Sequence, residues 1–166
     1  MVQELYTDGG VARRNPSPFG GAWAWVLVED GEILRQDSGI FHAGKYTEPY
    51  RISNNFIELY AAMEALMSQP IGWKGLVWTD SQVTQYRLQG SNSFEGIPSW
   101  LREGIKTLRF GRRWTVKLCG GHPNKIELAA GRRERNGLPV SRWNVQVDAE
   151  CARLCAELLA SASRRV

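Results

Sequence analysis

The segment that decides the fold is Gly75-Leu76-Val77-Trp78-Thr79-Asp80-Ser81-Gln82-Val83-Thr84-Gln85-Tyr86. Residues 75–79 have the apolar and aromatic content of a short buried strand, and residues 81–86 have the composition of a helix start. Asp80 stands between the two. Because a strand followed by a helix is typical of a βα unit, the segment predicts a parallel strand pairing in an α/β protein, with an acid at the strand end.

The N-terminal part predicts three more strands. Residues 3–7 form a short run with Leu5 and Tyr6 that ends at Asp8-Gly9-Gly10, which is typical of a strand running into a turn. Residues 22–28 and 33–38, separated by a turn at 29–32, predict a hairpin. If the first strand lies parallel to 75–79, Asp8 and Asp80 emerge side by side at the sheet edge where ligands bind in α/β proteins.

Helical spacing marks the remaining elements. Residues 55–67 carry an apolar stripe and a second face of small residues near Glu58, and Ser53 or Asn54 is suited to cap this helix. Residues 98–108 and 144–161 predict helices, 114–118 predicts a strand, and 41–52 and 120–141 are expected to be mostly irregular, with a helical turn at 126–130. The resulting order, βββαβα(α)βα, predicts a mixed sheet flanked by helices.

The composition suits one domain spanning 1–166. The chain has 166 residues, of which 43% are hydrophobic and 23% charged. No run approaches the roughly 18 apolar residues of a membrane span, and the first residues lack the pattern of a signal peptide. Three cysteines are too few for a disulfide scaffold. We therefore expect a soluble, cytoplasmic, monomeric protein with reduced thiols.

The net charge of +4 hides an asymmetry along the chain. Residues 102–142 hold eleven basic and three acidic residues, whereas the rest of the chain holds ten basic and fourteen acidic ones. Such a split favours a polyanionic partner for the basic part, although an ordinary solvated basic face would give the same pattern.

Four acids carry the predicted chemistry: Asp8, Glu58, Asp80 and Asp148, the last expected on the first turn of the final helix. Clustered carboxylates repel one another unless a cation lies between them. Mg²⁺ suits such oxygen ligands, Mn²⁺ is an alternative, and two ions about 4 Å apart clamp a phosphoryl displacement. Taken alone, Asp8 could be a turn former and Asp80 a helix cap.

Five ordered motifs give the chain a resemblance to the ribonuclease H type 1 family. These are Tyr6-Thr7-Asp8-Gly9-Gly10, Asn15-Pro16 with Gly20-Gly21, Ser53-Asn54-Asn55-Phe56-Ile57-Glu58-Leu59 with Ala61-Ala62, Thr79-Asp80-Ser81-Gln82, and Asn144-Val145-Gln146-Val147-Asp148. The resemblance implies the ribonuclease H fold, with a five-stranded mixed sheet, and hydrolysis of the RNA strand of RNA/DNA hybrids. The family's metal-binding acids fall on Asp8, Glu58, Asp80 and Asp148.

The resemblance also implies substrate contacts. Asn54, Asn55 and Gln82 fall where the family contacts the minor groove of the hybrid, and amides both donate to and accept from a ribose 2′-hydroxyl. Asn15 and Ser53 are candidates for backbone contact, and Asn144 is a further candidate. Helix capping is an alternative role for the two adjacent asparagines.

A histidine assists the reaction in this family, and two residues compete for its place. Matching Gly121-His122 to the Gly-His pair after the last strand gives the role to His122, whereas an ungapped alignment gives it to Cys119. We favour His122, because a Gly-flanked histidine changes its charge near neutral pH.

An inserted basic loop at about 123–142 follows His122. It carries Lys125, Arg132, Arg133, Arg135 and Arg142, whereas residues 88–96, where some family members have a basic handle, are not basic. We expect the loop, together with Arg109, Arg112 and Arg113, to bind phosphates.

Two other classes of function remain open at this stage. One is a noncatalytic module that uses the fold only to bind nucleic acid, which retention of all four acids disfavours. The other is a related nuclease with another substrate, such as a junction resolvase, a strand transferase or a 3′ exonuclease.

Overall fold

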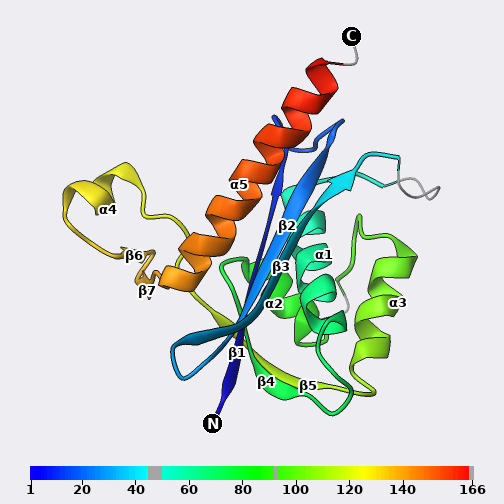
Figure 1. Cartoon of the computed structure of the whole chain (residues 1–166), viewed down its shortest axis with the longest axis vertical. Helices are drawn as coiled ribbons and strands as arrows, with labels where there is room; N and C mark the ends of the chain where they lie inside the picture. Colours follow the sequence, from blue (N-terminus) through cyan, green and yellow to red (C-terminus); the bar gives the residue numbers. More distant parts are fainter. Residues whose placement is uncertain (45–49, 92, 165–166) are drawn as a thin grey trace.

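Five strands form one mixed sheet in the order β3-β2-β1-β4-β5 (Figure 1). The computed structural model describes residues 1–44, 50–91 and 93–164. β1 pairs antiparallel with β2 and β2 with β3, whereas β1 pairs parallel with β4 and β4 with β5. The predicted mixed sheet is therefore confirmed. The strands are β1 Gln3–Val11, β2 Gly20–Glu29, β3 Glu32–His42, β4 Lys74–Thr79 and β5 Arg113–Leu118.

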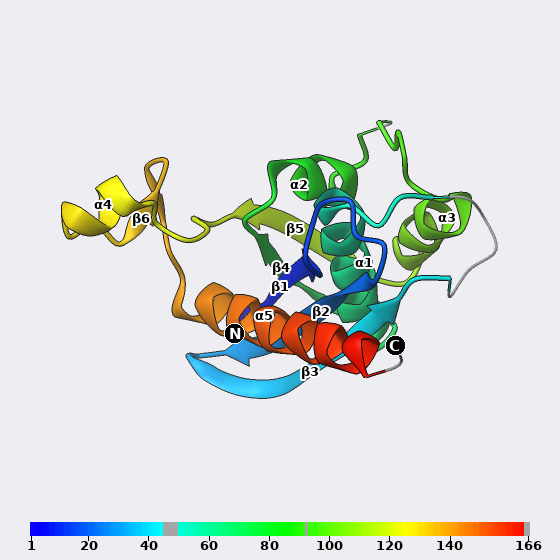
Figure 2. The same cartoon turned by 90° about the horizontal axis from the view of Figure 1, so that it is seen from above.

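Helices cover both faces of the sheet (Figure 2). α1 (Asn54–Met67), α2 (Gln82–Leu88) and α3 (Ser99–Leu108) lie on one side, and α5 (Arg142–Ser163) crosses the other. A short helix, α4 (Lys125–Ala129), and the two-stranded hairpin of β6 (Glu134–Arg135) and β7 (Leu138–Pro139) project away from the sheet.

Each face of the sheet has its own apolar core. Beneath α1, the predicted stripe and the alanine face are both buried, because the helix packs against β1 and β2 on one side and α3 on the other. Beneath α5, Val147 and Cys151 pack against Tyr6 and Val26. The sheet is thus fixed from both sides, which gives its carboxyl edge a defined shape.

Three boundaries differ from those predicted. Asp8 does not end its strand, because β1 continues to Val11 and stays paired with β2, where Asp8 faces Ala24. The turn preference of Asp-Gly-Gly is overridden by this antiparallel ladder. α5 begins at Arg142, capped by the Ser141 hydroxyl, so Asp148 lies on its second turn rather than its first. The loop expected at 41–52 falls partly in β3, and residues 45–49 lie outside the described part.

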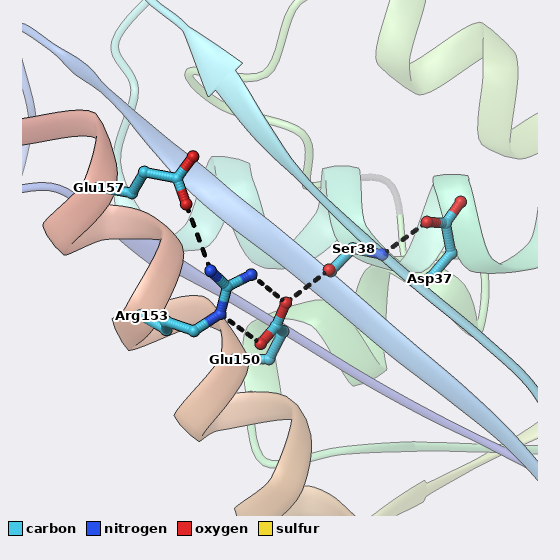
Figure 3. Close-up of polar contacts among 5 residues, drawn as sticks. All are labelled: Asp37, Ser38, Glu150, Arg153 and Glu157. Atoms are coloured by element: carbon cyan, nitrogen blue, oxygen red, sulfur yellow. Dashed lines mark hydrogen bonds and ion pairs between the residues drawn. The ribbon is translucent and has the colours of Figure 1, made fainter. Parts of the chain in front are cut away.

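A polar cluster ties α5 to the outer strand β3 (Figure 3). The Ser38 hydroxyl donates to Glu150 at 2.8 Å, and the Arg153 guanidinium donates to both Glu150 oxygens and to Glu157. Hydrogen bonds, first from Arg153 and then from Ser38, lower the pKa of Glu150 to about 2. The cluster fixes the position of α5, and Asp148 is carried by the same helix.

All three cysteines are free thiols, as expected. Among the described residues, the helices are too short or too polar to cross a bilayer.

Candidate active site

Asp8 and Asp80 come together through the register of β1 and β4. The last parallel pair in this ladder joins Tyr6 to Trp78, and each aspartate follows its ring-bearing neighbour by two residues. Since residues two apart share a face of a strand, Asp8 lies beyond the Tyr6 ring on the α5 side. The Tyr6 and Trp78 rings stack with centroids 5.8 Å apart, so strands β1 and β4 are close together just before Asp8 and Asp80.

Glu58 reaches this pair from α1 because Gly9 has no side chain. A Cβ at Gly9 would lie 2.5 Å from the carbonyl oxygen of Ile57 and 2.8 Å from the Glu58 nitrogen. Only glycine permits the helix to approach β1 so closely. Carboxylate oxygens of Asp8, Glu58 and Asp80 consequently lie within 4.8 Å of one another.

Burial and mutual repulsion raise the pKa of all three carboxyls. For Asp8, burial is the main cause of the raised pKa, followed by the charges of Asp80, Asp148 and Glu58. The Gly9 N–H donates to the Asp8 carboxylate at 2.8 Å and opposes this rise. Burial likewise raises the pKa of Glu58 to about 7. The pKa of Asp80 is raised by burial and the Asp148 charge. The folded chain therefore holds these carboxylates together at an electrostatic cost.

This cluster fits a divalent metal ion. Its donors are carboxylate oxygens alone, the set that hard cations such as Mg²⁺ and Mn²⁺ prefer. Burial, and after it the repulsion between neighbouring carboxylates, raises the pKa of all three groups, and a bound dication would favour their charged forms. Asp8, Glu58 and Asp80 are placed to hold such an ion.

Asp148 points into the same cleft from α5, and its carboxylate contacts the side chain of His122. Its Oδ2 contacts Nε2 of His122, whose side chain is 64% exposed. Asp148 also lines the cleft with the three clustered acids. The structure thus brings three of the four predicted metal ligands within 4.8 Å, and places the fourth beside them in a carboxylate–histidine pair.

The geometry separates the two candidates for the histidine role. His122 lies at the cleft and is exposed to solvent. Cys119 is 3% exposed, and burial, with the charges of Asp80 and Asp8, raises the pKa of its thiol to about 12. A thiol in this environment stays protonated and closed to water, so we retain His122 as the proton-carrying candidate.

The predicted substrate-contact residues occupy different places around the cleft. Asn15 and Asn54 line a cavity of about 440 Å³ together with the acids, and the Asn15 amide oxygen accepts from the Asn54 N–H at 3.2 Å. Ser53 caps α1 by accepting from Phe56. It lines a neighbouring cavity of about 400 Å³ with Asn55.

Gln82 and Asn144 differ sharply in exposure. Gln82 is exposed at the start of α2 and donates to the Tyr86 hydroxyl at 3.0 Å. Asn144 is 2% exposed, and its amide nitrogen donates to Asp80 at 3.5 Å. This hydrogen bond opposes the rise in the pKa of Asp80. Asn144 therefore positions the Asp80 carboxylate and favours its charged form, and presents little surface to a substrate.

Three residues of the cleft escaped the sequence analysis. Arg13 and Arg14 line it together with the acids, and the Ser81 hydroxyl, which caps α2, also hydrogen-bonds Glu58. The signal for the arginines was present, because they precede Asn15-Pro16 in the loop that leaves the Asp8 strand. The role of Ser81 depends on the packing of α1 against α2, which no local pattern encodes.

The structure does not bring Arg109, Arg112 and Arg113 to the acidic cleft, so it gives no support to their predicted contribution to a phosphate-binding track. Arg109 donates to the Leu88 carbonyl and lies over the Trp114 ring, and Arg112 donates to carbonyls after α1. Arg113 begins β5, at the end of the strand opposite the acids. The guanidiniums of Arg109 and Arg112 thus bind backbone carbonyls at the ends of α2 and α1.

Comparisons with known proteins agree with this fold. The chain is 32% identical over 143 residues to Ribonuclease H of Hahella chejuensis, a match that covers 84% of the chain and 78% of the relative. It is 34% identical over 106 residues to Ribonuclease H of Dechloromonas aromatica, covering 63% of the chain and 59% of that relative. No family model matches the chain.

Two solved structures share the fold. RNase H1 from the archaeon Halobacterium salinarum superposes with a TM-score of 0.62 at 21% identity, covering 95% of this chain and 99% of that one. The N-terminal RNase H domain of a Mycobacterium tuberculosis protein gives 0.66 at 16% identity, covering 96% and 97%. The fold and the acidic cleft define a ribonuclease H-like protein. At this identity and coverage, the chain belongs to the ribonuclease H family.

Proposed function

We propose that the protein is an endonuclease that hydrolyses the RNA strand of RNA/DNA hybrids, with two Mg²⁺ ions held by Asp8, Glu58, Asp80 and Asp148. The observation that carries the proposal is the approach of three carboxylates within 4.8 Å at the carboxyl edge of parallel strands. Membership of the ribonuclease H family supports it. When bound, the divalent ions activate water and stabilise the leaving oxygen.

The chain's own residues supply orientation and proton handling. The Asn144 amide fixes Asp80 and favours its ionised form, and the Ser81 hydroxyl holds Glu58. His122 lies against Asp148, so its imidazole is placed to carry a proton away from the cleft. His122→Ala should slow hydrolysis and leave substrate binding intact.

Amide side chains suit the recognition of ribose. Asn15 and Asn54 share the cavity of the acids, Ser53 and Asn55 the next one, and Gln82 is exposed nearby on α2. Amides donate and accept at once, which matches a 2′-hydroxyl. We assign minor-groove contacts to Asn54, Asn55 and Gln82, and backbone contacts to Asn15 and Ser53.

The test uses a labelled RNA/DNA hybrid, double-stranded RNA and double-stranded DNA, each with Mg²⁺, Mn²⁺ or EDTA. Wild type should cleave only the hybrid, and EDTA or Asp80→Asn should abolish cleavage. Cleavage that survives either change would contradict a metal-dependent mechanism. Binding without cleavage of any substrate would point to a noncatalytic module, and preferential cleavage of another substrate to a related nuclease.

We extend the proposal to the organisation of the chain. Residues 1–166 would form a single ribonuclease H domain with a basic insertion at about 123–142, acting as a monomer in the cytoplasm. Size-exclusion chromatography with light scattering tests the oligomeric state, and fluorescence microscopy of a tagged chain tests the location.

A further inference from the structure

An arm formed by residues 123–140 projects from the sheet between β5 and α5 (Figure 2). It contains α4 and the β6–β7 hairpin, and it points away from α3. None of its residues is needed to complete either apolar core. The arm is therefore not explained by packing of the fold.

The arm has a defined shape because one acid organises it. Glu127 forms a capping box with Asn124, accepts from the Asn136 N–H at 3.0 Å, and pairs with Arg135 at 3.4 Å. Its side chain is only 12% exposed. Glu127 is thus used inside the arm and does not offset positive charge on the arm's surface.

The outer surface of the arm is basic. Lys125, Arg132 and Arg133 are all exposed, and no ion pair of these three occurs within the described part of the chain. Glu134 is the arm's only other acid. Three cations without acidic partners on a projecting surface favour a polyanionic ligand.

The root of the arm lies at the acidic cleft. Gly120 pairs with Val140, and the Val140 N–H donates to the Arg133 carbonyl at 3.1 Å. The next residue, Gly121, packs on Asp80, since a Cβ there would lie 2.9 Å from Asp80 Oδ2. With strand spacings of about 4.8 Å, the Arg133 backbone lies roughly 10 Å from Gly120, within reach of a nucleic acid held in the cleft.

We propose that the arm binds the phosphate backbone of the nucleic acid whose scissile bond lies in the cleft, through Lys125, Arg132 and Arg133. This inference rests on the proposed function. A duplex carries one negative charge about every 1.7 Å along its axis, so a strand that crosses the cleft presents phosphates to a basic surface beside it. The arm would position the substrate and take no part in the reaction.

The test measures hybrid binding by fluorescence anisotropy in the Asp80→Asn background, from about 50 to 300 mM KCl. Arg132→Ala/Arg133→Ala should weaken binding roughly tenfold near 100 mM and make the salt dependence less steep by about 1 to 2 in log K against log [KCl]. The matched control is Lys74→Ala/Arg113→Ala. It removes two exposed cations, paired in register at the opposite end of the sheet, and should leave both quantities unchanged.

A charge-preserving variant completes the design. Arg132→Lys/Arg133→Lys should keep the wild-type salt dependence, because phosphate neutralisation needs charge rather than a guanidinium fork. Equal binding by the alanine variant and wild type at every salt concentration would overturn the inference. So would loss of binding in the Lys74/Arg113 control, which would show a nonspecific charge effect.

The same variants separate the inference from the proposed function. If wild type cleaves hybrids and the alanine variant binds them normally, only the arm's role is wrong. If wild type cleaves no hybrid, the proposed function itself fails. Ile126 and Leu128 of α4 are exposed, and the arm could instead bind a protein partner through them. In that case Arg132→Ala/Arg133→Ala would leave hybrid binding unchanged, and this result also overturns the inference.

Discussion

Glu58→Gln should stabilise the metal-free protein at alkaline pH. Burial raises the pKa of Glu58 from 4.5 to about 7. Since a pKa raised on folding means that the folded state disfavours the charge, the contribution of Glu58 is favourable below about pH 4.5 and is lost as pH rises through 7. The difference amounts to roughly 3 kcal/mol at about pH 8, as an upper limit. Glutamine cannot ionise and escapes this cost.

The assay is urea denaturation in EDTA at several pH values. The variant should exceed wild type in free energy of unfolding by up to about 3 kcal/mol near pH 8, and the gap should close toward pH 4.5. Adding Mg²⁺ should reverse the order, because only wild type keeps all of its carboxylates to bind the ion, and binding to the folded state stabilises it.

Glu64→Gln provides the control, since it makes the same chemical change on the same helix outside the cleft. We expect it to alter stability by less than about 0.5 kcal/mol at any pH. The reasoning is refuted if Glu58→Gln is no more stable than wild type near pH 8 in EDTA, or if Mg²⁺ stabilises both proteins equally.

Three further perturbations test other parts of the site and fold. Asn144→Ala should raise the pKa of Asp80 and weaken Mg²⁺ binding at neutral pH, as measured by calorimetry; unchanged affinity would remove the positioning role. Arg153→Ala should leave the stability near pH 7 almost unchanged, because the ion pairs are exposed to solvent. Arg153 lowers the pKa of Glu150, so the folded state is stabilised at neutral pH and loses this stabilisation as pH falls from about 5 to 2. The Arg153→Ala variant should therefore lose less stability than wild type over this pH range. Gly9→Ala should destabilise the fold by about 1–3 kcal/mol, since its Cβ would meet the backbone of α1 at 2.5 Å, and a melting temperature equal to that of wild type would contradict this.

Much of the fold is encoded locally and could be predicted. The strand–acid–helix order at residues 75–86 and the stripe in 55–67 define a parallel pairing and a helix buried on both sides, and both predictions are confirmed. The proximity of Asp8, Glu58 and Asp80 follows from the order of these elements.

What the sequence could not reveal depends on contacts between distant segments. Asp8-Gly9 favours a turn in isolation, but pairing with β2 keeps it extended. Arg112 lies in a basic stretch of sequence, yet its long side chain reaches carbonyls beyond α1. Glu127 has no special spacing to Asn136, and only the folded arm brings them together.

The closure of the arm at Gly120 and Val140 makes it a self-contained module. Because the outgoing and returning chains pair at the root, changes in length or composition beyond that point need not shift Gly121, His122 or the start of α5. Longer loops cost little additional closure entropy. If the arm binds phosphates as proposed, its affinity for the nucleic-acid backbone can therefore change while the geometry at the sheet edge stays the same.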